Sequence, residues 1–183
     1  MFNVIAYGSL LNKEERSKHG FNTTTVTPIV VDGFKRSFNQ EPSWRLRSER
    51  ERAVLSVAEQ TGSSFNALLI TGLDDNRLDS LDERERGYTR ISVPYLQLSP
   101  FFSGPLPQLT GPIYLYYGKP EKRNNSLLPN ASYLKLCMRG ALEWGQEFQN
   151  EFLTSTFIAG QTVRGFLTDR SNHSDELDLN KII

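Results

Sequence analysis

Apolar residues in the first two thirds of the chain come in short runs, many of them rich in β-branched or aromatic side chains. Most of these runs are bounded by Gly, Asn, Asp or Ser, which is typical of strands that end in turns. The pattern predicts strands over residues 4–6, 26–31, 34–38, 53–57, 65–73, 88–98 and 113–117.

Helical periodicity occurs in fewer places. Asn12 is a candidate N-cap for a short polar helix over 13–18, and Asp74 begins an Asp-Asp-Asn cap for a helix over 77–86. A longer helix is predicted over 131–152, because its apolar side chains recur on one stripe.

This order of many strands, few helices and one late long helix predicts an α+β domain built on a strongly curved sheet or small barrel. The length of 183 residues fits a single domain over 1–183, and the share of hydrophobic residues, 38%, is ordinary for a globular protein. The last dozen residues are polar, and we expect them to be mobile.

Charge and cysteine content exclude several classes of function. The chain carries 21 basic and 21 acidic residues, so no overall field attracts nucleic acid or an anionic membrane. Cys137 is the single cysteine, and the two histidines, His19 and His173, are far apart in the sequence, which argues against a disulfide, a metal site or a Ser-His-Asp triad. The N-terminus has no basic region or long apolar run, so we expect a cytoplasmic protein without a signal peptide or membrane span.

One segment, residues 34–52, interleaves aromatic and basic side chains, as a nucleic-acid groove does. Acidic residues interrupt it, among them Glu41 and Glu49, which favours a solvated rim instead. A third interpretation is that Trp44 and an arginine close over a carboxylate of a small substrate.

The helix predicted over 77–86 carries a carboxylate on its apolar face. Leu78, Leu81 and Glu85 are spaced i, i+3 and i+7, so they share one side of the helix. Burial raises the pKa of a carboxyl group toward the range in which it can both take and return a proton. The alternative is structural: Glu85 bends back to water or pairs with Arg86 or Arg90.

The turn after the first strand reads Tyr7-Gly8-Ser9-Leu10. Glycine suits a position where the backbone turns tightly or approaches a ligand closely. Successive N–H groups in such a turn can hold a carboxylate or a developing oxyanion. A plain strand-to-loop turn is the alternative, and the spacing of a phosphate-binding loop is absent.

Together these two features resemble the γ-glutamylcyclotransferase-like superfamily, whose marks are a Tyr-Gly-Ser turn after the first strand and a downstream glutamate in an Asp-x-x-Glu context. Here the marks are residues 6–11 (AYGSLL) and 81–88 (LDERERGY). The Asp-Gly-Phe sequence at 32–34 and the run over 53–73, which resembles the family's hairpin, lie between them. The resemblance covers residues 2–117, and Leu10 stands where many members have asparagine.

The resemblance implies a small closed β-barrel flanked by helices that uses no metal and no cofactor. It also implies a reaction in which the α-amine of a γ-glutamyl compound attacks its own γ-carbonyl and releases 5-oxoproline. In that reaction Glu85 would be the general acid and base, Gly8, Ser9 and Leu10 would hold the glutamyl group, and Tyr7 and Tyr88 would line the pocket. The expected partner is a small γ-glutamyl amino acid, peptide or amine, with no nucleic acid or membrane involved. The oligomeric state and the leaving group are left open, and a non-catalytic binding module of the same fold is the alternative.

Overall fold

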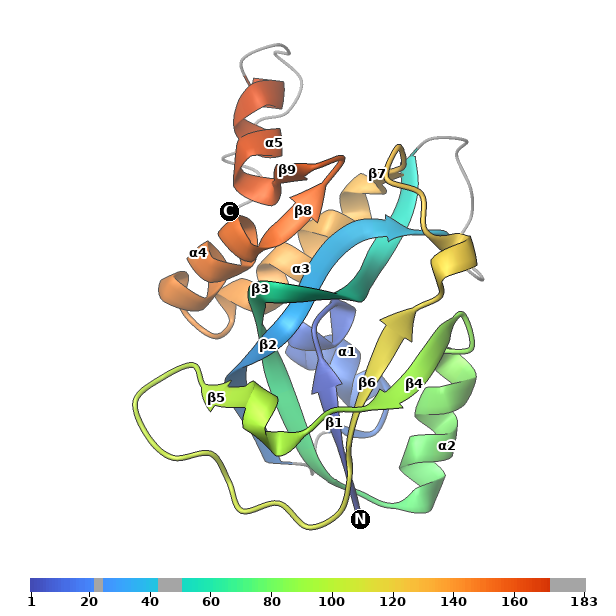
Figure 1. Cartoon of the computed structure of the whole chain (residues 1–183), viewed down its shortest axis with the longest axis vertical. Coiled ribbons are helices and arrows are strands. Elements are labelled where there is room, and N and C mark those ends of the chain that lie inside the picture. The colour runs from blue at the N-terminus through green and yellow to red at the C-terminus, as the bar shows by residue number, and fades with distance from the viewer. Residues whose placement is uncertain (22–24, 43–50, 172–183) are drawn as a thin grey trace.

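Two long strands dominate the structure, a computed structural model that describes residues 1–21, 25–42 and 51–171. β2 (Thr25–Gln40) and β3 (Glu51–Leu73) pair antiparallel along most of their length and are bent across the molecule (Figure 1). The register shifts next to Gly33, whose φ of +86° suits glycine. This irregularity explains why the sequence predicts two strands, 26–31 and 34–38, where the structure has one. The run 53–73 is likewise one bent strand rather than a hairpin.

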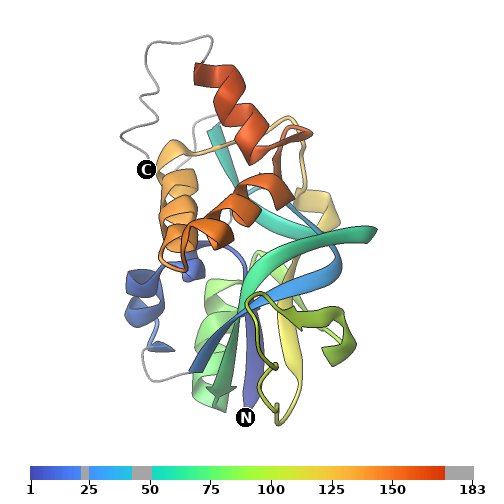
Figure 2. The ribbon, with the colours of Figure 1, turned by 90° about the vertical axis from the view of Figure 1, so that its left-hand side faces the viewer.

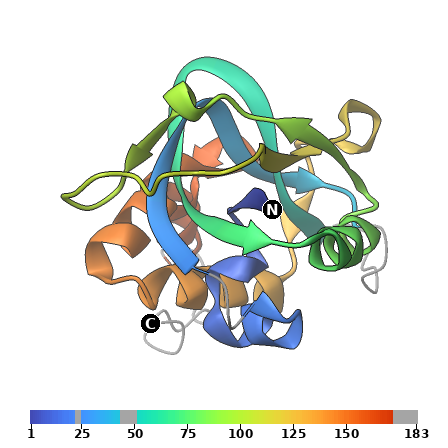
Figure 3. The ribbon, with the colours of Figure 1, turned by 90° about the horizontal axis from the view of Figure 1, so that it is seen from below.

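The sheet is mixed, in the order β4-β6-β1-β3-β2-β8-β9. β1 (Phe2–Ala6) lies between β6 (Ile113–Gly118), to which it is parallel, and β3, to which it is antiparallel. The shorter strands are β4 (Tyr88–Ser92), β5 (Leu98–Pro100), β7 (Leu128–Pro129), β8 (Thr156–Ile158) and β9 (Gln161–Thr162). Seen from below, the strands curve around the N-terminal end of the chain (Figure 3). Within the described residues this path of pairings does not close, so the strongly curved sheet is confirmed and the closed barrel is not.

The helices are α1 (Lys13–Lys18), α2 (Asp75–Arg84), α3 (Ala131–Leu142), α4 (Gln146–Ser155) and α5 (Val163–Ser171). Both predicted N-caps are confirmed: the Asn12 side chain accepts a hydrogen bond from the N–H of Glu15, and Asp74 accepts one from Arg77. α2 lies along the β4–β6 edge of the sheet (Figure 1). α1 and α3 lie side by side beyond the C-terminal end of β1 (Figure 2). None of the helices in the described residues is long and apolar enough to span a bilayer.

Two of the predicted elements are wrong in extent. The helix predicted over 131–152 breaks between α3 and α4, because Gly145 adopts a φ of +100°, which an α-helix cannot contain. The strand predicted over 88–98 ends at Ser92, and Pro94 begins a 3₁₀ turn, Tyr95–Gln97. The expected mobile tail falls in 172–183, outside the described residues.

A buried cation lies at the centre of the fold. Arg36 is fully buried between the rings of Phe65 and Phe152, and its guanidinium donates to the main-chain and side-chain oxygens of Asn66 at 2.6 and 2.8 Å. A third bond, 2.8 Å long, reaches the Thr156 hydroxyl. These hydrogen bonds offset part of the cost of burying the charge, and burial lowers the Arg36 pKa to about 9.

Candidate active site

The turn after β1 forms a short 3₁₀ helix, η1 (Ser9–Leu11). Its first hydrogen bond runs from the Leu11 N–H to the Gly8 carbonyl, 2.9 Å away. The N–H groups of Ser9 and Leu10 precede that bond and have no partner inside the turn. This leaves two main-chain donors next to each other at the end of the first strand.

Gly8 lies close to a side chain of the protein itself. A Cβ atom built on Gly8 would lie 3.1 Å from the Tyr133 hydroxyl and 3.6 Å from a methyl group of Leu55. The tight neighbour of Gly8 is therefore a tyrosine of α3, and a close approach to a ligand at this glycine remains a prediction.

The far end of the turn is held from two sides. Arg16 is buried and donates to the carbonyls of Leu10 and Leu11 at 2.8 and 2.6 Å. On the other side, α3 packs directly on the main chain, since a Cβ on Gly140 would lie 2.5 Å from the Asn12 nitrogen. These contacts fix the main-chain donors in place before any ligand arrives.

Glu85 follows the last residue of α2, and its N–H donates to the Leu81 carbonyl at 2.9 Å. Its side chain retains 20% of its exposure, and one carboxylate oxygen lies 3.1 Å from Nε of Arg84. Leu78 and Leu81 are buried, so the predicted alignment of the two leucines with Glu85 is present. The ion pair recorded for Glu85 is with Arg84, which the sequence did not suggest, and Arg90 pairs with Asp82.

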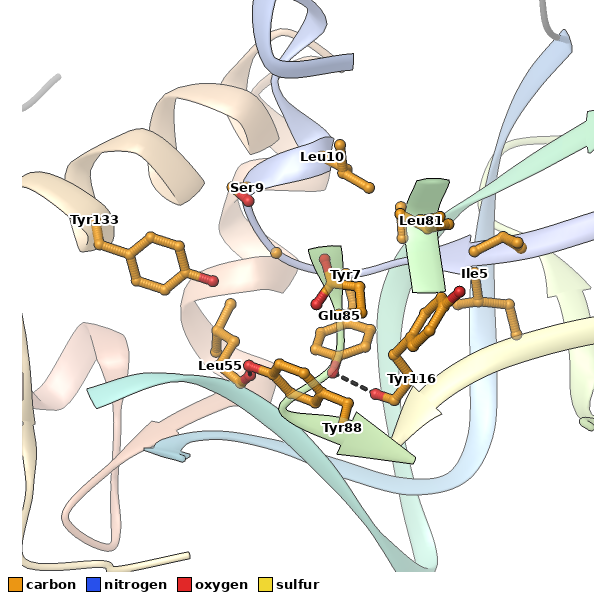
Figure 4. Close-up of a pocket in the computed structure, with 13 residues that line it drawn as sticks. Ile5, Tyr7, Ser9, Leu10, Leu55, Leu81, Glu85, Tyr88, Tyr116 and Tyr133 are labelled. Carbon is orange, nitrogen blue, oxygen red and sulfur yellow. Dashed lines mark hydrogen bonds between the residues drawn. The ribbon is translucent and has the colours of Figure 1, made fainter. Parts of the chain in front are cut away.

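A small cavity of about 50 Å³ lies between the turn and Glu85. Figure 4 shows Glu85 beside Tyr7, with the Tyr133 hydroxyl pointing toward them from the opposite side. All of the site residues predicted from the sequence line this cavity, together with residues that the sequence analysis did not select. The predicted set is Tyr7, Gly8, Ser9, Leu10, Glu85 and Tyr88, and the additions include Leu55, Leu81, Tyr116 and Tyr133.

Tyrosine side chains make up much of the wall, and their hydroxyl groups are engaged. Tyr7 donates to the main-chain carbonyl of Tyr116 at 2.5 Å, and Tyr88 donates to the carbonyl of Leu55 at 2.6 Å. The Tyr116 hydroxyl donates to Asp82 at 2.6 Å. These three hydroxyl groups are therefore held by hydrogen bonds within the protein.

Two of these phenols stay uncharged well above neutral pH. Burial raises the pKa of Tyr7 far above its ordinary value, and neighbouring Tyr88 and Glu85 raise it further. Burial and the bond to Asp82 raise the pKa of Tyr116 in the same direction. Among the described residues that line the cavity, Glu85 supplies the carboxylate, so near neutral pH it is the group suited to exchange a proton.

Two other expectations concern ligands beyond this cavity. Within residues 1–21, 25–42 and 51–171, no cluster of three or more His, Cys, Asp and Glu side chains is arranged to hold a metal ion. Trp44, Arg45, Arg47 and Arg50 lie outside the described residues, so the groove or rim remains a prediction for that part of 34–52. Arg36 and Phe38 of the same segment are fully buried and contribute to neither.

The comparisons with known proteins give a match in structure and none in sequence. No sequence-family profile matches the chain, and a search of curated proteins finds no significant relative. A solved structure described as a γ-glutamyl cyclotransferase matches with a TM-score of 0.59 at 21% identity, over 81% of this chain and 84% of that one. An uncharacterized protein from Homo sapiens matches with a TM-score of 0.60 at 22% identity over the same shares. YkqA from Bacillus subtilis gives a TM-score of 0.55 at 19% identity, over 81% of this chain and 51% of that one.

These matches show that the chain has the same fold as the solved structure described as a γ-glutamyl cyclotransferase. The resemblance inferred from the AYGSLL and LDERERGY segments is confirmed at the level of fold. In this chain the two segments meet at one cavity, with the turn on one side and Glu85 on the other.

Proposed function

We propose that this protein is a γ-glutamyl cyclotransferase that releases 5-oxoproline from a γ-glutamyl amino acid, peptide or amine. The observation that carries the proposal is the position of Glu85: it lines the same cavity as Ser9 and Leu10, the residues whose N–H groups have no partner inside the turn. A base and a site for an oxyanion are the two elements that this reaction requires.

In the proposed reaction, the substrate enters with its α-amine protonated, and Glu85 removes one proton so that the nitrogen can attack the γ-carbonyl carbon. A new C–N bond closes the five-membered ring, and the carbonyl oxygen takes up negative charge close to the N–H groups of Ser9 and Leu10. The bond to the leaving nitrogen then breaks as Glu85 returns its proton to that nitrogen. The ring nitrogen loses its second proton in the same collapse, and the released amine takes up one proton to become an ammonium ion. No water is consumed, and the protonation state of Glu85 is restored.

The proposed reaction needs few catalytic groups. The nucleophile and the carbonyl belong to one molecule, so the protein needs mainly to hold the reactive conformer. The rigid turn and the fixed tyrosine rings of the cavity wall are suited to that task. The second candidate is a binding module of the same fold, and the observation in its favour is the ion pair between Glu85 and Arg84, which equally suits a permanently charged, non-reacting carboxylate.

The test is release of 5-oxoproline by purified protein from three probes: glutathione, a γ-glutamyl amino acid and a γ-glutamyl amine. Glu85→Gln keeps the side-chain size and removes the base, so it should abolish release while the circular dichroism spectrum is unchanged. Glu83→Gln is the matched control, because Glu83 lies in the same turn of α2 and is exposed. The binding-module alternative predicts ligand binding without turnover, and full activity of Glu85→Gln would end the catalytic proposal.

A further inference from the structure

Arg84 joins the two halves of the candidate site. It is the last residue of α2, and its side chain keeps only 12% of its exposure. Its Nε lies 3.1 Å from a carboxylate oxygen of Glu85, and its Nη2 donates to the hydroxyl of Ser9 at 2.9 Å. One guanidinium therefore contacts both the proposed base and the turn after β1, although Arg84 and Ser9 lie 75 residues apart in the sequence.

The two contacts are made by neighbouring nitrogens of one planar group. A guanidinium can address two acceptors at a fixed spacing, whereas a lysine ammonium is a point charge on a flexible stem. Nη1 is buried and has no hydrogen-bond partner within the described residues. The recorded partners of this cation are Glu85, through an ion pair, and Ser9, through a hydrogen bond. The guanidinium therefore sets the spacing between the carboxylate and the turn.

Arg84 acts from behind the cavity. It does not line the pocket between the turn and Glu85, and it lines instead a separate open depression with His19 and Ser80. Burial, and then the charge of Arg84, lower the pKa of His19, the C-cap residue of α1. A bound substrate would meet Glu85 and the turn and not Arg84 itself.

The other titratable side chains that line the cavity around Glu85 are phenols. They are contributed by Tyr7 of β1, Tyr88 of β4, Tyr116 of β6 and Tyr133 of α3. Asp82, one turn back on α2, is held by Tyr116 and Arg90. Arg84 is the cation in the ion pair that is recorded for Glu85. Replacing Arg84 by a neutral residue therefore removes a positive charge next to the carboxylate.

We infer that Arg84 is a positioning residue: it fixes the carboxylate of Glu85 relative to the Ser9 turn and keeps that carboxylate ionised, ready to accept the substrate proton. The inference rests on the proposed cyclotransferase function. It assigns to Arg84 no contact with the substrate, and it predicts two separable effects, one from its charge and one from its two-point geometry.

The experiment compares Arg84→Gln and Arg84→Lys with Arg86→Gln, an exposed arginine two residues further along, as the control. Arg84→Gln removes the charge, so the acid limb of the kcat profile should move up by about one pH unit. Its kcat should fall by roughly tenfold to a hundredfold, because the base is misplaced. KM should change much less, because the residues that contact the substrate are still present. Arg84→Lys should keep the wild-type acid limb but lose kcat, since lysine cannot hold both acceptors. Arg86→Gln should match the wild type.

Two results would overturn the inference. The first is an Arg84→Gln protein with the kcat and the acid limb of the wild type. The second is an Arg84→Lys protein with the full kcat of the wild type. The second result overturns the inference even if Arg84→Gln does not fold. If the wild type releases no 5-oxoproline from any probe, the proposed function fails, and the role of Arg84 is tested without turnover. In that case the Glu85 carboxylate is titrated by ¹³C NMR, with its signal assigned by its loss in Glu85→Gln. A midpoint that rises in Arg84→Gln supports the inference, and an unchanged midpoint rejects it.

Discussion

Gly140 offers a quantitative test of how the fold holds the active-site turn. It lies inside α3, where alanine would normally stabilise a helix by about 1 kcal/mol relative to glycine. Here a Cβ atom would lie 2.5 Å from the Asn12 nitrogen and 2.8 Å from the Leu11 carbonyl carbon, both of them main-chain atoms. An ordinary contact begins near 3.4 Å, so α3 and the turn would have to separate by about 0.9 Å.

The size of the effect follows from these two opposing contributions. Overpacking of a well-packed site costs about 1–3 kcal/mol, and the upper end applies because a main-chain neighbour cannot rotate away. After the gain in helix propensity is subtracted, Gly140→Ala should lower the free energy of unfolding by about 2 kcal/mol. The displaced turn carries the Ser9 and Leu10 donors, so activity should fall as well.

The assay is urea unfolding followed by circular dichroism, with Gly165→Ala as the matched control. Gly165 also lies in a helix, α5, but its Cβ would meet only the Thr162 hydroxyl at an ordinary 3.4 Å. That variant should be as stable as the wild type or more stable by up to about 1 kcal/mol. If Gly140→Ala proves as stable as Gly165→Ala, then α3 does not press on the turn and the reasoning is refuted.

The remaining predictions concern the cavity wall. Gly8→Ala should reduce 5-oxoproline release, because its methyl group would lie 3.1 Å from the Tyr133 hydroxyl. Adding Tyr133→Phe to the same protein should restore part of the lost activity. If no activity is restored, a contact other than the one with Tyr133 causes the loss. The raised pKa values of Tyr7 and Tyr116 predict that both phenols stay protonated as the solution passes pH 10, where tyrosines of the unfolded chain ionise. Because the folded state then binds more protons than the unfolded state, the free energy of unfolding should fall as pH rises above about 10. A pH titration of tyrosinate absorbance, in the wild type and in Tyr116→Phe, measures the ionisation of Tyr116. Ionisation of Tyr116 near pH 10 would contradict the prediction that its pKa is raised.

Local sequence signals predicted the helix starts and the core of the candidate site. The caps at Asn12 and Asp74 depend on one side chain and the N–H groups beside it, so the sequence contains all the information needed. The spacing of Leu81 and Glu85 is equally local, and it indicated the face that turns toward the cavity.

What the sequence analysis missed depends on contacts between distant segments. Tyr133 lies within the helix predicted over 131–152, and nothing local distinguishes it there, because only the packing of α3 on the turn brings its hydroxyl close to Gly8. Arg36 looked like one basic residue in a solvated segment, yet its partners, Asn66 and Thr156, come from other strands. The break at Gly145 had a local signal, since glycine is costly inside a helix, but a glycine can also mark close packing, as Gly140 does.

In the proposed reaction the substrate nitrogen, and not water, attacks the γ-carbonyl with Glu85 as the base. Mass spectrometry distinguishes the two nucleophiles if the products are formed from a γ-glutamyl substrate in ¹⁸O-labelled water, with the wild type and with Glu85→Gln. We expect unlabelled 5-oxoproline from the wild type and no product above background from Glu85→Gln. Labelled glutamate from the wild type, or unlabelled 5-oxoproline at the same rate from both proteins, would contradict the proposed reaction.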